Sequence, residues 1–371
     1  MADSTTTYNV NNSTVLSQSP CWNRVYCVKV YQHQMGTIIS SSSSGSSNQW
    51  TEALQGDTVL QISNYNETTG ELIPGDNIRC SFDVQRYAIG QPNIATIKLY
   101  NLTADAETQL IVEGYRVVVS AGYQQNPGEI FDGFVVMASR TKENGTDYTL
   151  TLQCMDGYHF LTSAYCSYTV NRGATARELL TGIASKASVP ITIGHPTDSD
   201  SSVLDGTIYS RGFSVYGLAH KMIEDLAKTH NATWYVDNGK LYLIGYNETT
   251  SNLPIGEQAV ELSPSTGLLG NPLQIEYGVS AKSFINPKIA PYCFVHINPE
   301  YITAALPQIG SNGEVSNSEV YTLDTKGLYR VVSCEFVGDT RSNDWYVQFS
   351  AYTQSGRTPQ QLAGVSNGTM N

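Results

Sequence analysis

Charged residues are scarce in this chain. Asp, Glu, Lys and Arg make up 15% of its 371 residues, whereas soluble domains average about 25%. Basic residues are outnumbered, 21 against 33, which gives a formal net charge of −12. Proteins that hold nucleic acid by its phosphates need clustered Lys and Arg, and no such cluster occurs. A nucleic-acid-binding protein is therefore disfavoured, while plain solubility explains the negative charge equally well.

Segments that address a chain to a membrane are also missing. Residues 1–20 are polar and contain no apolar core, so a signal peptide is not expected. No run of about 18 apolar residues occurs, so we expect no membrane-spanning segment.

The cysteines do not suggest a disulfide framework. Their number is odd and no C-x-x-C motif occurs. Most lie within apolar runs and are interpreted as reduced core residues of a reducing compartment. The seven are Cys21, Cys27, Cys80, Cys154, Cys166, Cys293 and Cys334.

Known catalytic and metal-binding motifs are absent as well. There is no G-x-S-x-G, no Walker loop, no Rossmann fingerprint and no H-E-x-x-H. His220, Glu224 and His230 are near each other in sequence, but the polar side of an amphipathic helix explains them better than zinc. Four carboxylates could meet in space as a glycosidase pair, although strand and helix-cap positions account for each: Asp132, Asp147, Asp156 and Glu178. We predict no catalytic residues, no cofactor, no metal site and no enzyme activity.

Tyr, Gly, Ser, Thr and Asn take the place of the missing charge. The chain has 24 Tyr and 31 Gly. Protein interfaces favour Tyr and disfavour Lys and Glu, and strand-rich proteins have a similar composition. Aromatic side chains could also line a sugar-binding groove, but most fall on alternating strand positions. The composition therefore fits both a protein with many interfaces and a protein rich in β-strands.

Alternating apolar residues predict strand after strand over residues 76–161. In NIRCSFDVQRY the apolar face is Ile78, Cys80, Phe82 and Val84, and in NIATIKLYNL it is Ala95, Ile97 and Leu99. A strand over 25–31 precedes them, a turn at Asn144-Gly145 connects the last two, and one short helix at 102–113 has Thr103 as its N-cap. Strands at this spacing predict a closed or nearly closed antiparallel barrel.

Residues 170–245 have a different pattern. Thr175 to Glu178 form a capping box, and the helix that follows should bury Leu179, Leu180, Ile183, Ala184 and Ala187. A second helix is predicted to start after Ser214, because six apolar residues follow helical spacing: Val215, Leu218, Ala219, Met222, Ile223 and Leu226. A hairpin then turns at Asn238-Gly239.

Residues 255–360 return to strands, with a polar connector over 298–320 that is expected to be a loop. The sequence also contains a faint repeat. Residues 133–137 lead through a polar turn to Asp147-Tyr148-Thr149-Leu150, and residues 328–332 lead to Asp344-Trp345-Tyr346-Val347. We interpret these as two copies of one β module.

The order of these elements resembles the baseplate hub subunit of contractile-tailed bacteriophages, a relative of the hub part of type VI secretion spike proteins. The resemblance covers roughly residues 20–360. Its most telling pieces are IKLYNLT at 97–103 and WYVDNGKLYL at 234–243. The Ser-rich segment 36–57 matches no part of the family pattern.

The resemblance implies a mainly β fold with two antiparallel tail-tube-like β-barrels flanking a small α+β domain. The domains would be a flexible N-terminus at 1–20, a first barrel at 21–168, the α+β domain at 169–247, and a second barrel with a C-terminal tail at 248–371. A homotrimer would present six barrels as a pseudo-hexameric ring, which matches a six-fold partner.

The same resemblance implies the partners. The ring would join the tail tube protein to a central spike protein, contact other baseplate proteins, and let DNA pass through an acidic lumen. The protein would be made in the host bacterial cytoplasm and reside in the virion. Rival hypotheses are a tail tube or baseplate wedge protein, a glycan-binding tail adhesin, and a cell-wall hydrolase.

Overall fold

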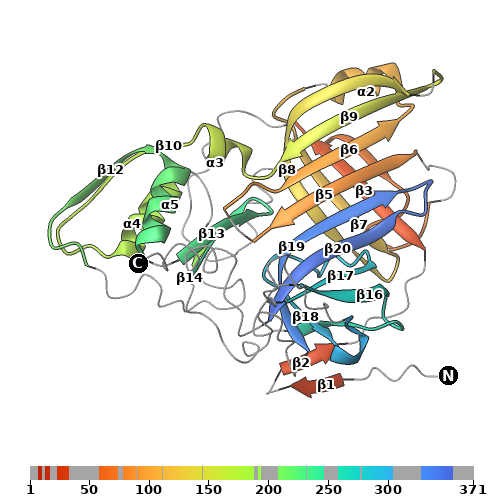
Figure 1. The fold of residues 1–371 in the computed structure, drawn as a ribbon. Helices are drawn as coiled ribbons and strands as arrows, with labels where there is room; N and C mark the ends of the chain where they lie inside the picture. Colours follow the sequence, from red (N-terminus) through yellow and green to blue (C-terminus); the bar gives the residue numbers. More distant parts are fainter. Residues whose placement is uncertain are drawn as a thin grey trace, which may run out of the picture.

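The structure is a computed structural model. It describes residues 7–10, 13–16, 23–32, 58–73, 78–88, 90–110, 112–143, 145–187, 191–193, 208–230, 232–245, 258–275, 278–303 and 327–353. The Ser-rich segment 36–57, Cys21 and most of the connector 298–320 lie outside these residues. Strands dominate, which confirms the mainly β prediction (Figure 1).

Twenty strands, four helices and one 3-10 turn lie within the described residues. The strands are β1 (Thr7–Val10), β2 (Ser13–Leu16), β3 (Arg24–Tyr31), β4 (Thr58–Ser63), β5 (Cys80–Tyr87), β6 (Ile94–Tyr100), β7 (Arg116–Tyr123), β8 (Asn126–Glu143), β9 (Asp147–Met155), β10 (Tyr165–Val170), β11 (Ile191–Ile193), β12 (Phe213–Leu218), β13 (Ala232–Asp237), β14 (Lys240–Gly245), β15 (Gln258–Leu262), β16 (Leu268–Ile275), β17 (Gly278–Phe284), β18 (Phe294–Ile297), β19 (Leu328–Asp339) and β20 (Trp345–Thr353). The helices are α2 (Ala104–Leu110), α3 (Tyr158–Thr162), α4 (Ala176–Lys186) and α5 (Ala219–Thr229), with η2 at Pro299–Tyr301.

Fifteen of these strands form one sheet. Its main path runs β1-β2-β15-β18-β19-β5-β6-β9-β8-β7-β3-β4, and β20, β17 and β16 branch from β19. Strand β19 therefore joins the N-terminal β region to the C-terminal one, because one of its edges pairs with β5. Over the described residues no pairing closes either region on itself, so the two predicted barrels are not confirmed.

The strands of this sheet form where the sequence alternates. In β5 each second residue is buried, from Cys80 through Phe82 and Val84, as the pattern predicts. In β6 the buried residues are Ala95, Ile97 and Leu99. Thr103 caps α2, since its hydroxyl accepts a hydrogen bond from the Ala106 N–H at 3.4 Å.

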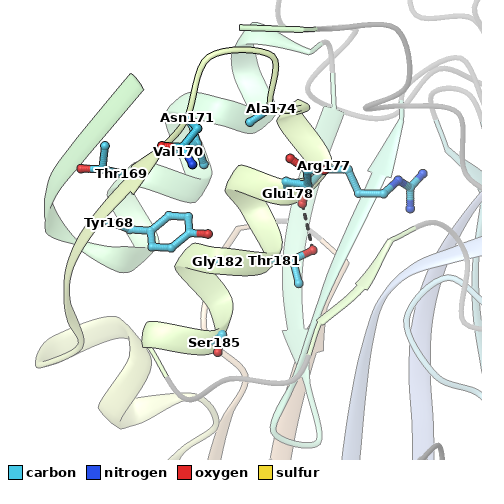
Figure 2. Close-up of a pocket in the computed structure, with 10 residues that line it drawn as sticks. All are labelled: Tyr168, Thr169, Val170, Asn171, Ala174, Arg177, Glu178, Thr181, Gly182 and Ser185. Atoms are coloured by element: carbon cyan, nitrogen blue, oxygen red, sulfur yellow. Dashed lines mark hydrogen bonds between the residues drawn. The ribbon is translucent and has the colours of Figure 1, made fainter. Parts of the chain in front are cut away.

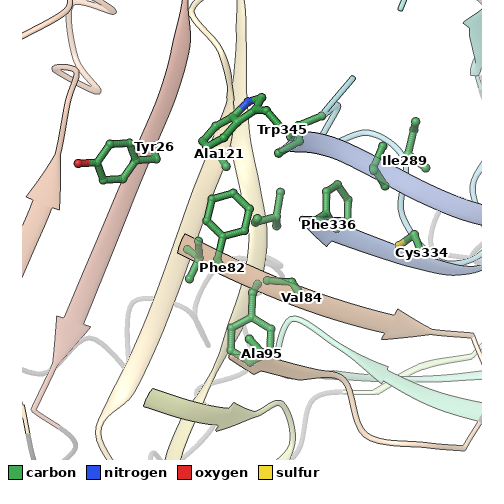
Figure 3. Close-up of a cluster of buried hydrophobic side chains, with 14 of the residues drawn as sticks. Tyr26, Phe82, Val84, Ala95, Ala121, Ile289, Cys334, Phe336 and Trp345 are labelled. Carbon is green, nitrogen blue, oxygen red and sulfur yellow. The ribbon is translucent and has the colours of Figure 1, made fainter. Parts of the chain in front are cut away.

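A single hydrophobic core serves both β regions. Phe82, Val84 and Ala95 of the N-terminal region pack in the same cluster as Phe336 and Trp345 of the C-terminal region (Figure 3). The Phe82 and Trp345 rings meet edge to face with centroids 5.3 Å apart. The two regions are therefore joined by continuous packing as well as by backbone pairing.

Five cysteines are buried and Cys293 is partly buried, and none of the six described cysteines forms a disulfide: Cys27, Cys80, Cys154, Cys166, Cys293 and Cys334. This agrees with their interpretation as reduced core residues. Burial raises the pKa of Cys27 to about 11 and that of Cys80 to about 12, because an apolar surrounding disfavours the thiolate.

Residues 158–245 form a second, smaller hydrophobic cluster beside the sheet (Figure 1). Helix α4 has the predicted capping box: the Thr175 hydroxyl accepts from the Glu178 N–H, and the Glu178 carboxylate accepts from the Thr175 N–H. Strands β13 and β14 pair as a hairpin whose turn, as predicted, is Asn238-Gly239. Both turn residues have positive φ, 49° and 71°, as a type I′ turn requires.

The predicted start of the second helix is wrong. Residues 213–218 form β12, which pairs with β10 from Val170↔Phe213 to Tyr165↔Leu218, and α5 begins only at Ala219. Helical spacing extends into this segment, but backbone pairing with β10 takes precedence over local periodicity. Gly217, at φ 144°, also has a backbone conformation that a helix cannot accommodate.

The N-terminal segment, expected to be flexible, includes a short hairpin. Strands β1 and β2 pair with each other, and β2 also pairs in parallel with β15. The polar composition that suggested a flexible segment includes Thr and Val, which suit an edge strand.

Candidate assembly surface

The two β regions are copies of one strand pattern. Repeat 1 comprises β3 and β5–β9, and repeat 2 comprises β15–β20. Their neighbour orders are β5-β6-β9-β8-β7-β3 and β16-β17-β20-β19-β18-β15, and in each repeat the strands occupy matching places in both chain order and sheet order. One pairing differs, since β3 and β7 are antiparallel whereas β15 and β18 are parallel.

The hairpins that suggested the repeat also match in detail. In β8–β9, Met137 to Glu143 pair with Gln153 to Asp147, and β8 has a bulge at Val136, just before this paired stretch. In β19–β20, Ser333 to Gly338 pair with β20, and β19 has a bulge at Val332, just before this paired stretch. The Asp339 N–H donates to the Asp344 carbonyl at 2.9 Å. The equivalent residues are therefore Val136 and Val332, which shifts the alignment made from sequence by one residue.

The six central strands of this sheet have one buried and one polar face. On β17 the buried residues Val279, Ala281 and Ser283 occupy the positions that Ala95, Ile97 and Leu99 occupy on β6. The opposite face of β5, β6, β9, β17, β19 and β20 carries mainly uncharged polar side chains and is partly exposed: Ser81, Gln85, Thr96, Thr151, Gln153, Ser280, Ser333, Gln348 and Ser350.

Carboxylates outnumber lysines on this polar face. Its carboxylates are Asp83, Asp147, Glu335 and Asp339, and its lysines are Lys98 and Lys282. Burial, with a smaller contribution from Glu335, raises the pKa of Asp83 above its usual range. The Gln85 side chain donates to Glu335 at 3.3 Å. This surface is thus polar, carries more carboxylates than lysines, and is shared by both repeats.

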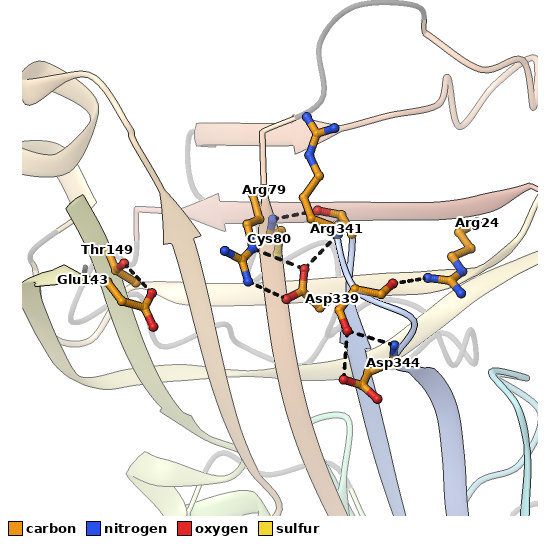
Figure 4. Close-up of polar contacts among 10 residues, drawn as sticks. Arg24, Arg79, Cys80, Glu143, Thr149, Asp339, Arg341 and Asp344 are labelled. Atoms are coloured by element: carbon orange, nitrogen blue, oxygen red, sulfur yellow. Dashed lines mark hydrogen bonds and ion pairs between the residues drawn. The ribbon is translucent and has the colours of Figure 1, made fainter. Parts of the chain in front are cut away.

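Polar contacts hold repeat 2 against repeat 1 at the end of β19 (Figure 4). Arg79 donates to the Asp339 carboxylate at 2.9 Å, and Arg24 donates to the Ser342 carbonyl at 2.7 Å. The buried Trp345 indole N–H donates to the Gly122 carbonyl at 3.2 Å. Together with the β5–β19 pairing, these contacts form the interface between a repeat 2 and a repeat 1.

Strand β19 changes partner along its length. Before the bulge at Val332 it pairs with β18, and from Ser333 to Asp339 it pairs with β5. Strand β8 pairs with β7 as far as Phe134. From Met137 to Glu143, the distal half of β8, its only pairing among the described residues is with β9. The distal half of β8 is the equivalent of Ser333–Asp339 on β19, and the edge that β5 covers there is open on β8.

A buried polar network fixes the smaller cluster to repeat 1. Arg86 on β5 donates to both carboxylate oxygens of Asp237, at 2.8 and 2.6 Å. The Asn93 amide donates to the Val236 carbonyl at 2.9 Å, and the Asp156 carboxylate accepts the Gly239 N–H at 3.0 Å. Burial, then the nearby Asp237, raises the pKa of Asp156 well above its usual range.

No motif in the sequence announces this network, although one residue does signal it. Arg86 continues the inward-facing series of β5 after Cys80, Phe82 and Val84, and a buried Arg requires an acidic partner. That partner, Asp237, lies at the end of β13, far along the chain, so only the folded arrangement could identify it.

The histidines considered for zinc do not converge. His220 packs edge to face on Phe160, His230 caps the end of α5, and Glu224 pairs with Lys228. Burial lowers the pKa of both histidines. No cluster of three or more His, Cys, Asp or Glu residues that could hold a metal occurs in the described part of the chain.

The four candidate carboxylates likewise have separate structural roles. Asp132 accepts from Arg116 in a buried ion pair, with Nε and Oδ1 2.7 Å apart. Asp147 accepts from the Asn101 amide at 3.0 Å. Asp156 receives the Gly239 N–H, and Glu178 belongs to the α4 capping box. These contacts give no acid–base pair.

An open groove of about 510 Å³ lies between β10 and α4 (Figure 2). Its polar groups already serve the helix, since the Thr181 hydroxyl donates to the Arg177 carbonyl at 2.8 Å and Glu178 completes the capping box. The groove therefore offers no convergent set of free polar groups. No helix in the described residues has the length and apolar character needed to cross a membrane.

Comparison with known proteins gives a family match. The family model described as baseplate hub gp41 matches residues 59–291. No curated protein sequence matches the chain.

Solved structures that match the chain include two tail proteins and the Francisella PdpA-VgrG complex. The 43 kDa tail protein of prophage MuSo2 from Shewanella oneidensis is 11% identical, over 77% of this chain and 96% of that one, with a TM-score of 0.43. A tail protein from Neisseria meningitidis MC58 is 8% identical, over 74% and 91%, with a TM-score of 0.45. The Francisella PdpA-VgrG complex is 9% identical, over 91% and 59%, with a TM-score of 0.48.

Proposed function

Because the chain belongs to the baseplate hub gp41 family, whose model matches residues 59–291, we propose that it forms a trimeric hub ring connecting the tail tube to a central spike. Family membership places the protein in the virion tail as a structural component. The trimer, its ring and the two partners are the proposal. Synthesis in the bacterial cytoplasm before assembly belongs to the same proposal.

The duplicated strand pattern supports this role most directly. Each chain presents two repeats with the same strand order, so three chains would present six similar units to a six-fold partner. Closed symmetric assemblies commonly satisfy such matches. In this proposal each repeat contributes one tail-tube-like segment, and barrel-like closure is completed around the ring by neighbouring copies. The divisions 21–168, 169–247 and 248–371 belong to the proposal too, although Phe160 and Cys166 pack in the smaller cluster.

The polar face of the central strands is the best candidate for the channel lining. It offers uncharged polar side chains together with four carboxylates and two lysines. DNA adheres to surfaces through clustered cations. A face on which carboxylates outnumber lysines would let DNA pass without strong binding, in keeping with the acidic lumen that the resemblance implies.

Stoichiometry tests the proposal. Light scattering of the purified chain should give three copies of the 40.5 kDa subunit, and images of tails that contain it should show a ring of six units. Six copies per tail would favour a wedge protein, and many copies along the tail would favour a tube protein. Binding on a glycan array by a subunit that never joins a tube end would favour an adhesin.

A further inference from the structure

Within the part of the chain that the structure describes, the distal half of β8, Met137–Glu143, pairs with β9 on one edge and with no strand on the other, whereas repeat 2 covers the equivalent edge. Its counterpart Ser333–Asp339 on β19 pairs residue for residue with β5. An open edge exposes N–H and C=O groups that can pair with another strand. The same hairpin thus has a covered edge in repeat 2 and an open edge in repeat 1.

The register of the two repeats identifies the strand that should cover the open edge. On β19, Val337 pairs with Asp83 of β5. Its equivalent on β8 is Thr141, because both lie five residues beyond the bulge. Asp83 pairs with Thr96 on β6, and at the matching place in repeat 2 Leu273 pairs with Ser280 on β17. The equivalent of Asp83 is therefore Leu273, on β16.

We infer that the distal half of β8 pairs with β16 of a second copy of this chain, in the β5–β19 register found within one chain. That register is carried by Leu273–Ile275, since β16 has a register shift between Leu269 and Leu273. This inference rests on the proposed ring, and it names the edges that join neighbouring subunits. Within a chain, repeat 2 meets repeat 1 through β19 and β5. Between chains, repeat 1 would meet the next repeat 2 through β8 and β16.

Exposed apolar side chains on both edges agree with this contact. Met137 on β8 is 46% exposed and Leu273 on β16 is 58% exposed. In addition, Tyr148 beside the distal half of β8 is 41% exposed, whereas its equivalent Trp345 is 2% exposed under the cover of repeat 1. The end of the β19–β20 hairpin is thus covered by repeat 1, whereas the end of the β8–β9 hairpin is exposed.

Two features of the edges bear on how the contact forms. Thr303 lies against β16, where it accepts the Gln274 N–H at 3.0 Å and donates to the Pro272 carbonyl at 2.8 Å. Pairing with β8 would exchange these two hydrogen bonds for equivalent ones. Lys142 is exposed on β8, and the half-exposed Arg140 pairs with the buried Glu107 of α2 at 2.9 Å. Charged residues of this kind can also protect an edge from pairing.

Paired cysteines test whether the β8 edge pairs with β16 of another subunit or stays unpaired. Residues opposite each other on antiparallel strands have Cβ atoms close enough for a disulfide bridge. The full chain carrying T141C and L273C should form covalent dimers and trimers under mild oxidation, resolved on a non-reducing gel. The matched control, D83C with V337C, should form a link within one chain and remain at the monomer mass.

Mixing the two single variants supplies the decisive arm. A T141C chain mixed with an L273C chain should give a linked dimer, and neither variant alone should. Dimers of T141C alone would mean that two β8 edges pair with each other, and a T141C–L273C link within one chain would place β16 on its own β8. Either result overturns the inference.

Light scattering on the same samples separates this inference from the proposed function. A trimer without the T141C–L273C link, while the D83C–V337C control forms, overturns the edge pairing and leaves the hub ring standing. A monomer at every concentration, with no link between chains, overturns both.

Discussion

Repeat 1 and repeat 2 share their strand order but differ in what covers the end of each hairpin. In repeat 2, Trp345 lies between Phe82 and the Gly122 carbonyl. In repeat 1, the equivalent residue is Tyr148. Among the described residues, its ring contacts are with cations of its own hairpin, and the Arg140 guanidinium lies 4.4 Å from the ring centroid. In the proposed ring, the duplicated module would use this surface twice, once within the chain and once between subunits.

The largest expected effect comes from deleting the covered aromatic side chain. W345A should lower the free energy of unfolding by about 3–5 kcal/mol, because it leaves a cavity and strands the Gly122 carbonyl. Y148A should cost about 1 kcal/mol or less in the isolated subunit, since an exposed cation–π contact contributes little. Urea unfolding followed by tryptophan-independent circular dichroism would measure both. Equal losses would mean that the two hairpin ends are equally buried.

A second contrast concerns the start of the same hairpins. Repeat 1 buries the Arg116–Asp132 ion pair, and repeat 2 has the fully buried Phe294 and Leu328 at the matching positions. D132L alone should cost about 3–5 kcal/mol, because it leaves the Arg116 guanidinium buried without its carboxylate.

The double change R116F/D132L copies the apolar solution of repeat 2 into repeat 1. It should recover most of the loss and restore stability to within about 1 kcal/mol of the wild type, since replacing a buried ion pair with apolar groups is often neutral. Thermal unfolding of the two variants would test this. A double variant no better than D132L would show that the site needs its charges, for instance through the nearby Glu129.

These paired positions also show how far the sequence could predict the structure. Strand alternation gave the inward faces of β5 and β6, and the Thr175–Glu178 and Asn238-Gly239 signals gave a helix cap and a turn, because each depends on a few adjacent residues. The β5–β19 pairing, which merges the two β regions, depends on strands some 250 residues apart, and no local pattern specifies it. For the same reason the open edge of β8 could not be identified before its counterpart was seen to be covered.

A smaller effect is expected at Gly338, where the hairpin of repeat 2 meets repeat 1. A Cβ placed there would lie 2.2 Å from the Phe82 ring, which is held between strands and against Trp345. G338A should therefore cost about 1–3 kcal/mol through overpacking. The matched change K142A, at the equivalent exposed position of repeat 1, should fall within about 0.5 kcal/mol of wild type. Chemical denaturation would measure the free energy of unfolding of both variants. A neutral G338A would mean that Phe82 is not packed tightly against Gly338.

The smallest effect should be a pH dependence that arises in repeat 1. Burial, with a smaller contribution from Asp132, raises the pKa of Glu129 to about 7 from an ordinary value of 4.5. Below pH 4.5 the carboxyl is neutral in both the folded and the unfolded chain, and above pH 7 it is charged in both, so the folded state bears the full cost of the buried charge only at the higher pH. E129Q should therefore be more stable than wild type at pH 8, by about 1 kcal/mol since the side chain is only partly shielded from water, and the difference should vanish as the pH falls through 7 toward 4.5. Melting temperatures of E129Q and of the exposed control E113Q across this range would measure it. A difference that is the same at pH 5 and pH 8 would mean that Glu129 does not titrate in this window.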